Sequence, residues 1–363
     1  MKSVLITGST GFVGKNLLRS LVKDTDIGKF YLLVRNIGKA KVTLSEIIKV
    51  TDKLGKKIKF LEGNIIYENI GLSEDDMQAI KDINEIYHLA ANISLSIKDK
   101  EEISKVNLDG TVNLFNIIKE FKNIKNIFYF STGYVCGKGK QIVNEDWITD
   151  RDNFRNPYEK SKYLAERFIK EFIDSHNIPI VIIRPTIIGT RNNSKYKELK
   201  YQTIYYYATV LREAISMQGD DREIRLVGRS DITFNLITIE DLIDILLEIR
   251  KLGKKSRIYN LASNSNFSVL SYLDGVKNAT GFGSDFNFVQ DIHFDNETSS
   301  ENLINRKTES YFEYDLDSYL DWNIENTKDI RKKLNIKDRG NKWIKDHINN
   351  FLLFDENEFT KKV

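Results

Sequence analysis

Two residues of a predicted helix have the types and spacing to move a proton. Tyr158 and Lys162 are four positions apart, which brings their side chains to one face of a helix expected from about Tyr158 to Ile173. A phenol with an ordinary pKa of about 10 is a poor proton donor and acceptor at neutral pH. A nearby ammonium stabilises the phenolate and moves that pKa towards the working range. The pair therefore predicts acid–base chemistry, although this spacing also arises by chance in a lysine-rich chain.

A hydroxyl group is expected close to this pair. Ser131 and Thr132 directly follow the predicted strand Ile127–Phe130. Ligands of open parallel sheets bind in the crevice at the carboxyl ends of the strands. We therefore expect Thr132 to face the same crevice as Tyr158.

The segment Thr7-Gly8-Ser9-Thr10-Gly11-Phe12-Val13-Gly14 lies between a predicted strand and a predicted helix. Gly8 permits a tight turn, Gly11 lets a pyrophosphate approach the backbone, and Gly14 lets the helix lie close to the sheet. The helix N-terminus would then bind the anion. The motif predicts dinucleotide binding, the alternative being a purely structural turn, and its cofactor-binding residues would be Gly8, Thr10, Gly11, Phe12 and Val13.

Arg35 ends the second predicted strand, where a carboxylate would bind a ribose 2′-hydroxyl and select NAD. An arginine instead offers its planar guanidinium to a 2′-phosphate. The sequence therefore favours NADP(H), the alternative being a solvated arginine.

Further cofactor contacts are expected where later strands end. Asn64 can accept the adenine amino hydrogen through its side-chain oxygen, and His88 is interpreted as a structural histidine. The remaining expected cofactor contacts are Ile65, Ala90, Ala91, Asn92, Pro185, Thr186 and Ile188.

Strands and helices alternate strictly through the first half of the chain, which predicts an α/β fold with a Rossmann-type, doubly wound parallel sheet. After Pro185 the pattern is interrupted, and it resumes in a helix Glu240–Arg250 and a strand Ile258–Leu261. We therefore expect a cofactor domain of residues 1–185 plus about 232–262. A smaller C-terminal α/β substrate region would comprise about 186–231 and 263–354, with a frayed tail at 355–363.

The composition excludes several classes of protein. The 363 residues carry a net charge of +3, which is too balanced to make nucleic acid the default partner. One cysteine and four histidines argue against a disulfide framework and a metal centre. No signal peptide or membrane-spanning stretch is evident, so a cytoplasmic protein is expected.

Several motifs occur in the order typical of one superfamily. After the glycine motif come His88-Leu89-Ala90-Ala91, Asn107-Leu108-Asp109-Gly110-Thr111, Ser131–Gly137, Asn156–Lys162 and Arg184-Pro185-Thr186. Together they resemble the extended short-chain dehydrogenase/reductase superfamily. Within it, Leu33-Val34-Arg35, Asn144-Glu145-Asp146 and Phe154–Glu166 are similar to the branch of fatty acyl-CoA reductases and carrier-protein thioester reductases, the male-sterility type.

The resemblance implies a role for each matching residue. Tyr158 would be the catalytic acid and Lys162 its ribose-binding partner, while Thr132 would polarise the substrate carbonyl. Asn107 is similar to the helix asparagine that helps to position the site. Asn64 departs from the usual aspartate, and Cys136, where an aromatic residue often stands, is interpreted as a small buried filler.

Three functions remain open at this stage. The leading one is NADPH-dependent reduction of an acyl thioester, bound to coenzyme A or to an acyl carrier protein, to an aldehyde and in some cases on to an alcohol. The main rival is a nucleotide-sugar epimerase, dehydratase or reductase, and the third is a non-catalytic NADP sensor. A homodimer is left open. The Tyr-rich segment Tyr201–Met217 would either line a substrate channel or be an ordinary amphipathic helix.

Overall fold

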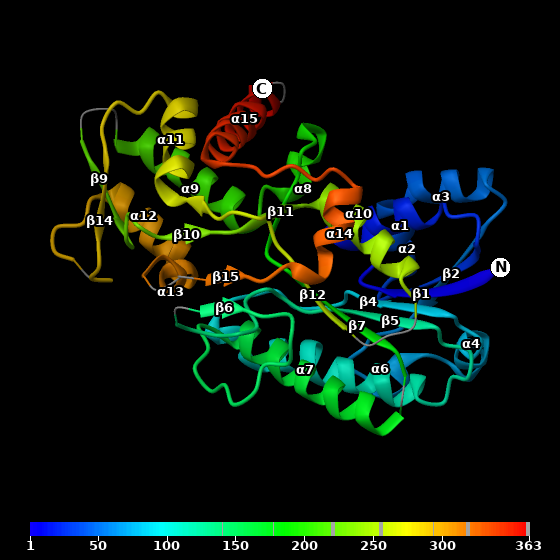
Figure 1. The fold of residues 1–363 in the computed structure, drawn as a ribbon. Coiled ribbons are helices and arrows are strands. Elements are labelled where there is room, and N and C mark those ends of the chain that lie inside the picture. Colours follow the sequence, from blue (N-terminus) through cyan, green and yellow to red (C-terminus); the bar gives the residue numbers. More distant parts are fainter. Residues whose placement is uncertain are drawn as a thin grey trace.

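The computed structural model describes residues 1–139, 141–176, 178–218, 222–253, 257–292, 294–316 and 320–360. Its centre is a seven-stranded parallel sheet with the strand order β12-β7-β5-β4-β1-β2-β3 (Figure 1). The strands are β1 (Lys2–Thr7), β2 (Ile27–Val34), β3 (Lys57–Glu62), β4 (Glu85–His88), β5 (Asn126–Phe130), β7 (Ile180–Pro185) and β12 (Arg257–Leu261). The chain order reverses between β1 and β4, which opens a crevice at the carboxyl ends of these two strands.

The central strands are nearly continuous apolar runs because both faces of the sheet are covered. In β1, Val4 and Ile6 face one hydrophobic core and Leu5 faces the other, and all three are fully buried. Such a strand can occupy only the middle of a layered α/β fold.

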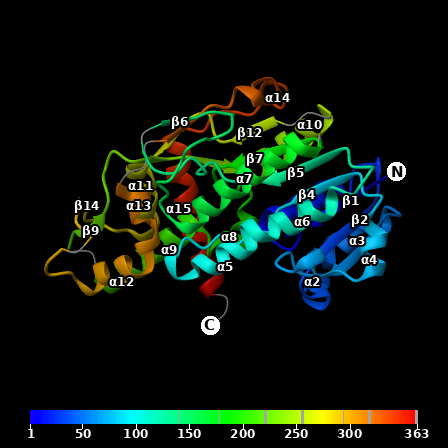
Figure 2. The ribbon, with the colours of Figure 1, turned by 90° about the horizontal axis from the view of Figure 1, so that it is seen from below.

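Helices cover the two faces as separate layers (Figures 1 and 2). One face is covered by α1 (Phe12–Leu21), α2 (Ile37–Thr43), α3 (Ser45–Lys53) and α10 (Ile239–Lys251). The other face is covered by α4 (Glu74–Ile80), α6 (Gly110–Ile118) and α7 (Pro157–His176), with the short α5 (Lys100–Ser104) beside α7. This arrangement confirms the predicted doubly wound Rossmann-type sheet.

The strand predicted at Ile258–Leu261 lies in the main sheet. It belongs to β12, which pairs in parallel with β7, and α10 precedes it on the face that also carries α1. The chain therefore returns to the sheet after its interruption. The exact division into a cofactor domain and a substrate region stays a prediction.

The rest of the chain forms a smaller α/β region beside the carboxyl ends of the strands (Figure 1). Its sheets are all two-stranded and pair β8 with β11, β9 with β14, β10 with β13, and β6 with β15. These strands are β6 (Gln141–Val143), β8 (Ile187–Gly189), β9 (Ile224–Val227), β10 (Thr233–Phe234), β11 (Leu236–Thr238), β13 (Phe267–Ser268), β14 (Phe286–Val289) and β15 (Leu320–Trp322).

The helices of this region are α8 (Tyr196–Leu199), α9 (Thr203–Gln218), α11 (Val269–Thr280), α12 (Ser299–Thr308), α13 (Phe312–Leu316), α14 (Lys328–Lys333) and α15 (Asn341–Thr360). The α11 and α15 helices pack against each other, and α9 contacts both. Helix α15 includes the first residues of the tail expected to fray, and residues 361–363 lie outside the described ones.

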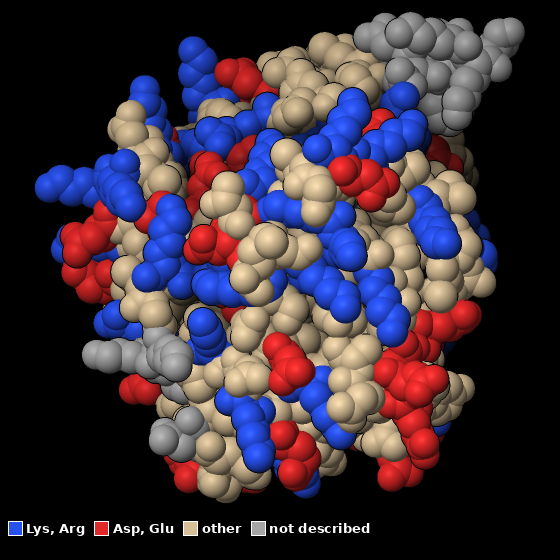
Figure 3. Space-filling model, turned by 90° about the vertical axis from the view of Figure 1, so that its right-hand side faces the viewer, with Lys and Arg blue, Asp and Glu red and all other residues tan. Residues whose placement is uncertain are grey.

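Basic side chains are conspicuous on the side of the molecule that carries the first half of the sheet. Figure 3 shows lysine and arginine side chains across the centre of this face, with acidic side chains among them and a group of acidic side chains at its lower right. The exposed lysines of α2 and α3 are Lys39, Lys41, Lys49 and Lys53. A surface of this kind raises the local concentration of anions even though the net charge is only +3.

Candidate active site at the carboxyl ends of the strands

The fold brings together Thr132, Tyr158 and Lys162, as the sequence predicts. Thr132 follows β5, whereas Tyr158 and Lys162 lie one turn apart at the start of α7. A hydrogen bond joins the side chains of Thr132 and Tyr158, and the Thr132 hydroxyl also accepts one from the Tyr134 N–H at 3.2 Å. The phenol and the hydroxyl therefore face one point in space, where a carbonyl oxygen could accept from both.

The surroundings of Tyr158 favour its protonated form. Burial raises the pKa of Tyr158 to about 12, the hydrogen bond with Thr132 opposes this rise, and the Glu159 charge adds to it. Lys162 is not among the groups that shift this pKa, so the lowering of the Tyr158 pKa that the sequence predicts from Lys162 is not seen in this structure. The phenol is therefore a proton donor at neutral pH.

The Lys162 amine is turned towards the sheet. Its Nζ donates to the Phe130 carbonyl at 2.7 Å and lies 4.9 Å from the centre of the Tyr129 ring. Burial lowers the pKa of Lys162 to about 7, against the opposing effect of the Glu166 charge. Small changes around this amine, such as an approaching anion, would therefore change its charge near neutral pH.

Asn107 connects two walls of the site. It lies in a π-helical turn, Lys105–Asp109, and turns of this type are frequent at functional sites. Its Oδ1 accepts from the Asn92 N–H at 2.8 Å, and its Nδ2 donates to the Asn92 carbonyl and to Ser161 Oγ, both at 2.9 Å. Asn107 thus holds the loop after β4 against α7, one turn from Tyr158.

The glycine motif has the close packing that its spacing predicts. Gly8 has φ +71°, and an added Cβ would lie 2.7 Å from the Ala90 nitrogen and the Leu89 carbonyl carbon. A Cβ at Gly14 would lie 2.2 Å from the Gly8 oxygen. At Gly11 the nearest atom would be 3.4 Å away, and Thr10 and Gly11 form the exposed end of the loop. The loop therefore keeps one open side.

This open side fits the diphosphate of a dinucleotide. Among the described residues no side chain caps the N-terminus of α1, so its N–H groups are available to an anion. The buried hydroxyls of Ser9 and Ser131 have no hydrogen-bond partner in the described part of the chain. The Phe12 side chain packs in the core, so only its backbone can bind, and Val13 is also packed against that core.

The residues expected around the adenosine end lie at neighbouring strand ends. Arg35 follows β2 and is exposed, with no ion pair in the described parts of the molecule. Asn64 follows β3, and its Oδ1 accepts from the Ile66 N–H at 3.3 Å. Ile65 is buried against Gly110, where an added Cβ would lie 2.8 Å from its side chain. The Ile65 side chain therefore packs against the start of α6 and cannot itself face a ligand.

The loop after β4 is fixed by hydrogen bonds. The Ala90 N–H donates to Thr7 Oγ1 at 3.1 Å, and Asn92 Oδ1 accepts from the Ser94 N–H at 2.9 Å. His88 bonds Thr7 and Thr111 through its two ring nitrogens, at 2.7 and 3.1 Å, and burial lowers its pKa to about 3. His88 is therefore a neutral structural residue, which agrees with its interpretation from the sequence. Ala91 lies between Ala90 and Asn92, which these hydrogen bonds hold in place.

A cavity of about 570 Å³ begins at Thr132 and Tyr158 and extends into the C-terminal region. Pro185, Thr186 and Ile188 form part of its wall, and the Thr186 hydroxyl donates to Asn235 Oδ1 at 2.9 Å. The α9 segment lines it through Thr203, Ile204 and Tyr207, together with Tyr201 and Gln202 just before the helix. Tyr205 instead points away, with its hydroxyl 2.6 Å from His347 Nε2. The tyrosines of this segment thus divide between the wall of the cavity and the hydrophobic core.

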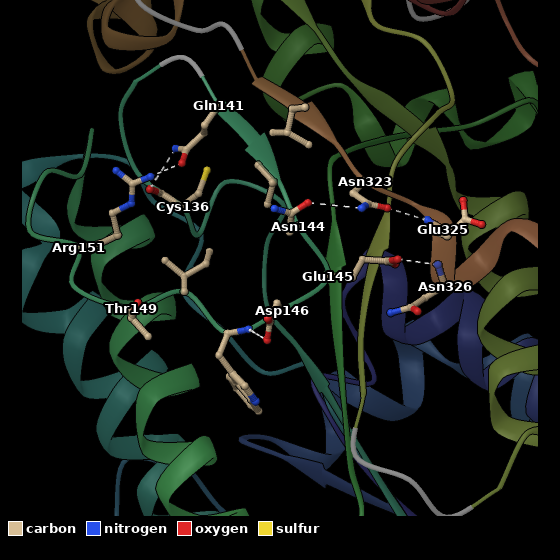
Figure 4. Close-up of a pocket in the computed structure, with 14 residues that line it drawn as sticks. Cys136, Gln141, Asn144, Glu145, Asp146, Thr149, Arg151, Asn323, Glu325 and Asn326 are labelled. Carbon is tan, nitrogen blue, oxygen red and sulfur yellow. Dashed lines mark hydrogen bonds between the residues drawn. The ribbon is translucent and has the colours of Figure 1, made fainter.

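A second hollow, of about 560 Å³, lies between the β6 segment and residues 323–326 (Figure 4). Its polar groups bind one another. Glu145 accepts from the Asn260 N–H at 2.9 Å and the Asn326 N–H at 2.6 Å, and Asn323 donates to Asn144 at 3.4 Å. The Asn144-Glu145-Asp146 motif therefore ties the C-terminal segment to the sheet. Cys136, at the edge of this hollow, is buried as expected, and burial raises its pKa to about 12.

Sequence reasoning missed the residues that complete the cavity wall. The Tyr314 hydroxyl donates to Glu159 Oε1 at 2.7 Å and accepts from Asn156 Nδ2 at 2.8 Å, which joins α13 to the start of α7. Tyr134 and Asp315 also line the cavity. Tyr314 and Asp315 belong to no motif, and Tyr134 lies in the Ser131–Gly137 motif but was given no role from the sequence.

Two kinds of feature are absent from the described residues. They contain no group of three or more His, Cys, Asp or Glu side chains that could hold a metal ion. No helix among them is long and apolar enough to cross a membrane.

Comparison with known proteins identifies the family. Residues 6–238 match the family model described as male sterility protein. The chain belongs to this family. It is an extended short-chain dehydrogenase/reductase of the fatty acyl-CoA reductase-like branch, and hence an NAD(P)-dependent oxidoreductase.

Individual relatives of this family member differ in activity. The chain is 27% identical over 273 residues to the dTDP-D-glucose 4,6-dehydratase of Bos taurus, which covers 74% of the chain and 70% of that enzyme. It is 26% identical over 226 residues to the fatty acyl-CoA reductase wat of Drosophila melanogaster, covering 52% of the chain but only 43% of the relative. The terminal R domain of the myxalamid PKS-NRPS pathway shares the fold, with a TM-score of 0.75 at 18% identity over 99% of this chain and 92% of that domain.

Proposed function

We propose that the protein reduces an acyl thioester to an aldehyde with NADPH. The observation that carries this proposal is the Thr132–Tyr158 pair at the mouth of a cavity of about 570 Å³. Much of the cavity wall is aliphatic or aromatic, including Ile187, Ile232, Leu226 and Phe234. Such a wall binds an acyl chain through burial of apolar surface.

The two hydroxyls would act on the carbonyl oxygen of the thioester. When bound, NADPH supplies the hydride that adds to the carbonyl carbon. Tyr158 gives its proton to the oxygen, and Thr132 donates a hydrogen bond that stabilises the charge developing there. Loss of one such donor costs about 10²–10³-fold in rate in well-studied enzymes. The product is a hemithioacetal, which collapses as its carbon–sulfur bond breaks, the hydroxyl loses its proton and the thiolate gains one.

The remaining predicted residues would place the cofactor. The glycine loop would bind the diphosphate, and Arg35 would bind the 2′-phosphate. Lys162, whose amine donates to the Phe130 carbonyl, would hold the nicotinamide ribose. Asn107 is a positioning residue in this scheme, since its partners are Asn92 and Ser161. The preference for NADPH over NADH rests on Arg35.

The proposal is tested by NADPH oxidation against acyl-CoAs, acyl-carrier thioesters and nucleotide sugars. We expect aldehyde and free thiol in equal amounts from at least one thioester, with turnover lowered at least about 10²-fold in Tyr158→Phe. Tyr163→Phe is a matched control on the same helix, because the Tyr163 hydroxyl accepts from the Arg151 N–H outside the cavity. Near-normal turnover of Tyr158→Phe would refute the mechanism.

A second candidate function is supported by the dehydratase relative, whose match covers 74% of the chain. A nucleotide-sugar enzyme would use the same Thr132, Tyr158 and Lys162 side chains on a sugar carbon. Conversion of a nucleotide sugar without net NADPH consumption, together with no activity on any thioester, would decide for this alternative.

A further inference from the structure

One carboxyl group in the cavity wall has no part in the proposed reaction. Asp315, on α13, borders the same cavity as Thr132 and Tyr158. Its Oδ2 atom is shielded from solvent and has no hydrogen-bond partner among the described residues. A carboxylate in such a place is unfavourable unless a cation or a donor pairs with it. The missing partner is therefore expected to come from the ligand.

Among the described residues, none forms an ion pair with Asp315. Arg229 also lines the cavity, but its guanidinium is bound to Asp231 by two contacts, of 2.9 and 2.8 Å. Burial alone raises the pKa of Asp315 to about 8. Without a ligand the group thus holds a proton at neutral pH, and a cation nearby would displace it.

Three tyrosine rings line the same cavity within electrostatic reach of this carboxyl. The Tyr207 ring centre lies 6.2 Å from that of Tyr272 and 6.3 Å from that of Tyr311, and all three rings border the cavity. Burial raises the pKa of each phenol, and the Asp315 charge adds to the rise in all three. Aromatic faces beside a carboxylate are the usual surroundings of a bound ammonium group. We call these four residues the Asp315 corner.

We propose that the Asp315 corner binds an ammonium group at the end of the acyl chain remote from the thioester. The preferred substrates would then be thioesters whose acyl chain ends in an amino group. The preference for these substrates rests on the proposed thioester reduction, whereas the binding of an ammonium group does not. An ammonium pairs with the carboxylate and uses the ring faces together. A hydroxyl-bearing substrate could bind the carboxyl group but would leave the rings unused.

The inference is tested with matched pairs of pantetheine thioesters that end in either an amino or a methyl group, over a series of chain lengths. At the optimal length we expect kcat/KM to favour the amino member by about tenfold to a hundredfold. Asp315→Asn should remove this preference by lowering kcat/KM for the amino member towards the value of the methyl member. Glu313→Gln is the control, because Glu313 lies on the same helix and pairs with Lys138 at the surface. Equal kcat/KM values for both members in the native protein would overturn the inference.

The preference should also depend on pH through Asp315. As the pH rises from 6.5 to 8.5 the carboxyl ionises, so the preference for the amino member should grow in the native protein and stay flat in Asp315→Asn. The other groups facing the corner keep their charge over this range, because burial keeps the Tyr207, Tyr272 and Tyr311 phenols protonated and Arg229 stays paired with Asp231. The same rise in Asp315→Asn would contradict the assignment.

A binding measurement separates this inference from the proposed function. Calorimetry with hexylammonium chloride should show binding to the native protein, weaker binding to Tyr207→Leu and none to Asp315→Asn, with circular dichroism confirming that each variant is folded. Asp315-dependent binding without reduction of any thioester would support the corner and refute the proposed function. Reduction of methyl-ended thioesters, with no preference for the amino members and no ammonium binding, would do the reverse.

Discussion

The side-chain amide of Asn107 donates a hydrogen bond of 2.9 Å to the hydroxyl of Ser161, which in turn donates to the Tyr158 carbonyl at 2.8 Å. This chain of contacts links a π-helical turn to the helix that carries Tyr158 and Lys162. Through its bonds to Asn92, the same amide fixes the loop after β4. One asparagine therefore sets the distance between the expected cofactor loop and the reacting phenol.

Replacing Asn107 should affect stability and geometry together. Asn107→Ala removes two hydrogen bonds to the half-buried Asn92 backbone and one of the two bonds of Ser161. At about 1 kcal/mol for each bond, we expect the free energy of unfolding to fall by about 2–3 kcal/mol. Urea denaturation measures this loss. Asn113→Ala, which removes one bond to the Ile65 carbonyl, is the control and should cost less. Equal losses in the two variants would show that the link is unimportant.

The glycine loop allows a comparison between two left-handed glycines. Gly8 and Gly55 have φ +71° and +66°, but a Cβ at Gly55 would meet no atom within 4 Å, whereas at Gly8 it would clash with Ala90 and Leu89. Gly55→Ala should therefore cost only the backbone strain, about 1–2 kcal/mol. We expect Gly8→Ala to be clearly more destabilising and to abolish cofactor binding, measured by thermal unfolding and NADPH fluorescence. Similar melting temperatures for both variants would contradict this reading of the loop.

Local patterns in the first half of the chain were sufficient to predict most of the sheet and a shared crevice for Thr132 and Tyr158. The glycine spacing, the apolar strands and the one-turn separation of Tyr158 and Lys162 each depend on neighbouring residues and on the known geometry of parallel sheets. The direction of the Lys162 amine depends instead on the Phe130 carbonyl, 32 positions away. Periodicity carries no information about such a contact.

The residues of the cavity wall could not be predicted from the sequence for the same reason. It is assembled from α9, α11, α13 and short strands that meet only in the folded chain. Asp315 stands in a sequence of ordinary polar and aromatic residues, and its isolation follows from burial rather than from any motif. The Tyr201–Met217 segment gave a partial signal, because its tyrosines divide between the cavity and the core.

The buried Lys162 should make stability depend on pH. Its pKa falls from 10.5 in the unfolded chain to about 7 in the folded one, so folding releases a proton between these pH values. The unfolded state then binds more protons, and the free energy of unfolding rises with pH from about 7 towards 10. Lys162→Met should flatten this rise. We would compare urea denaturation of both proteins at pH 7 and pH 9; an identical pH dependence would show that the amine is not the group responsible.

The last prediction concerns the choice between NADPH and NADH. Arg35 follows β2 and is exposed, with no ion pair in the described ranges, so a 2′-phosphate could meet its guanidinium without displacing another partner. Arg35→Ala should weaken NADPH binding by about ten- to hundredfold and leave NADH binding nearly unchanged, because only NADPH carries the phosphate. Fluorescence titration of both cofactors gives the two dissociation constants. Lys41→Ala, which removes an exposed positive charge from α2, is the matched control and should shift NADPH binding only slightly and only at low salt. If the native protein bound both cofactors equally, Arg35 would not discriminate between them and the proposed preference for NADPH would be wrong.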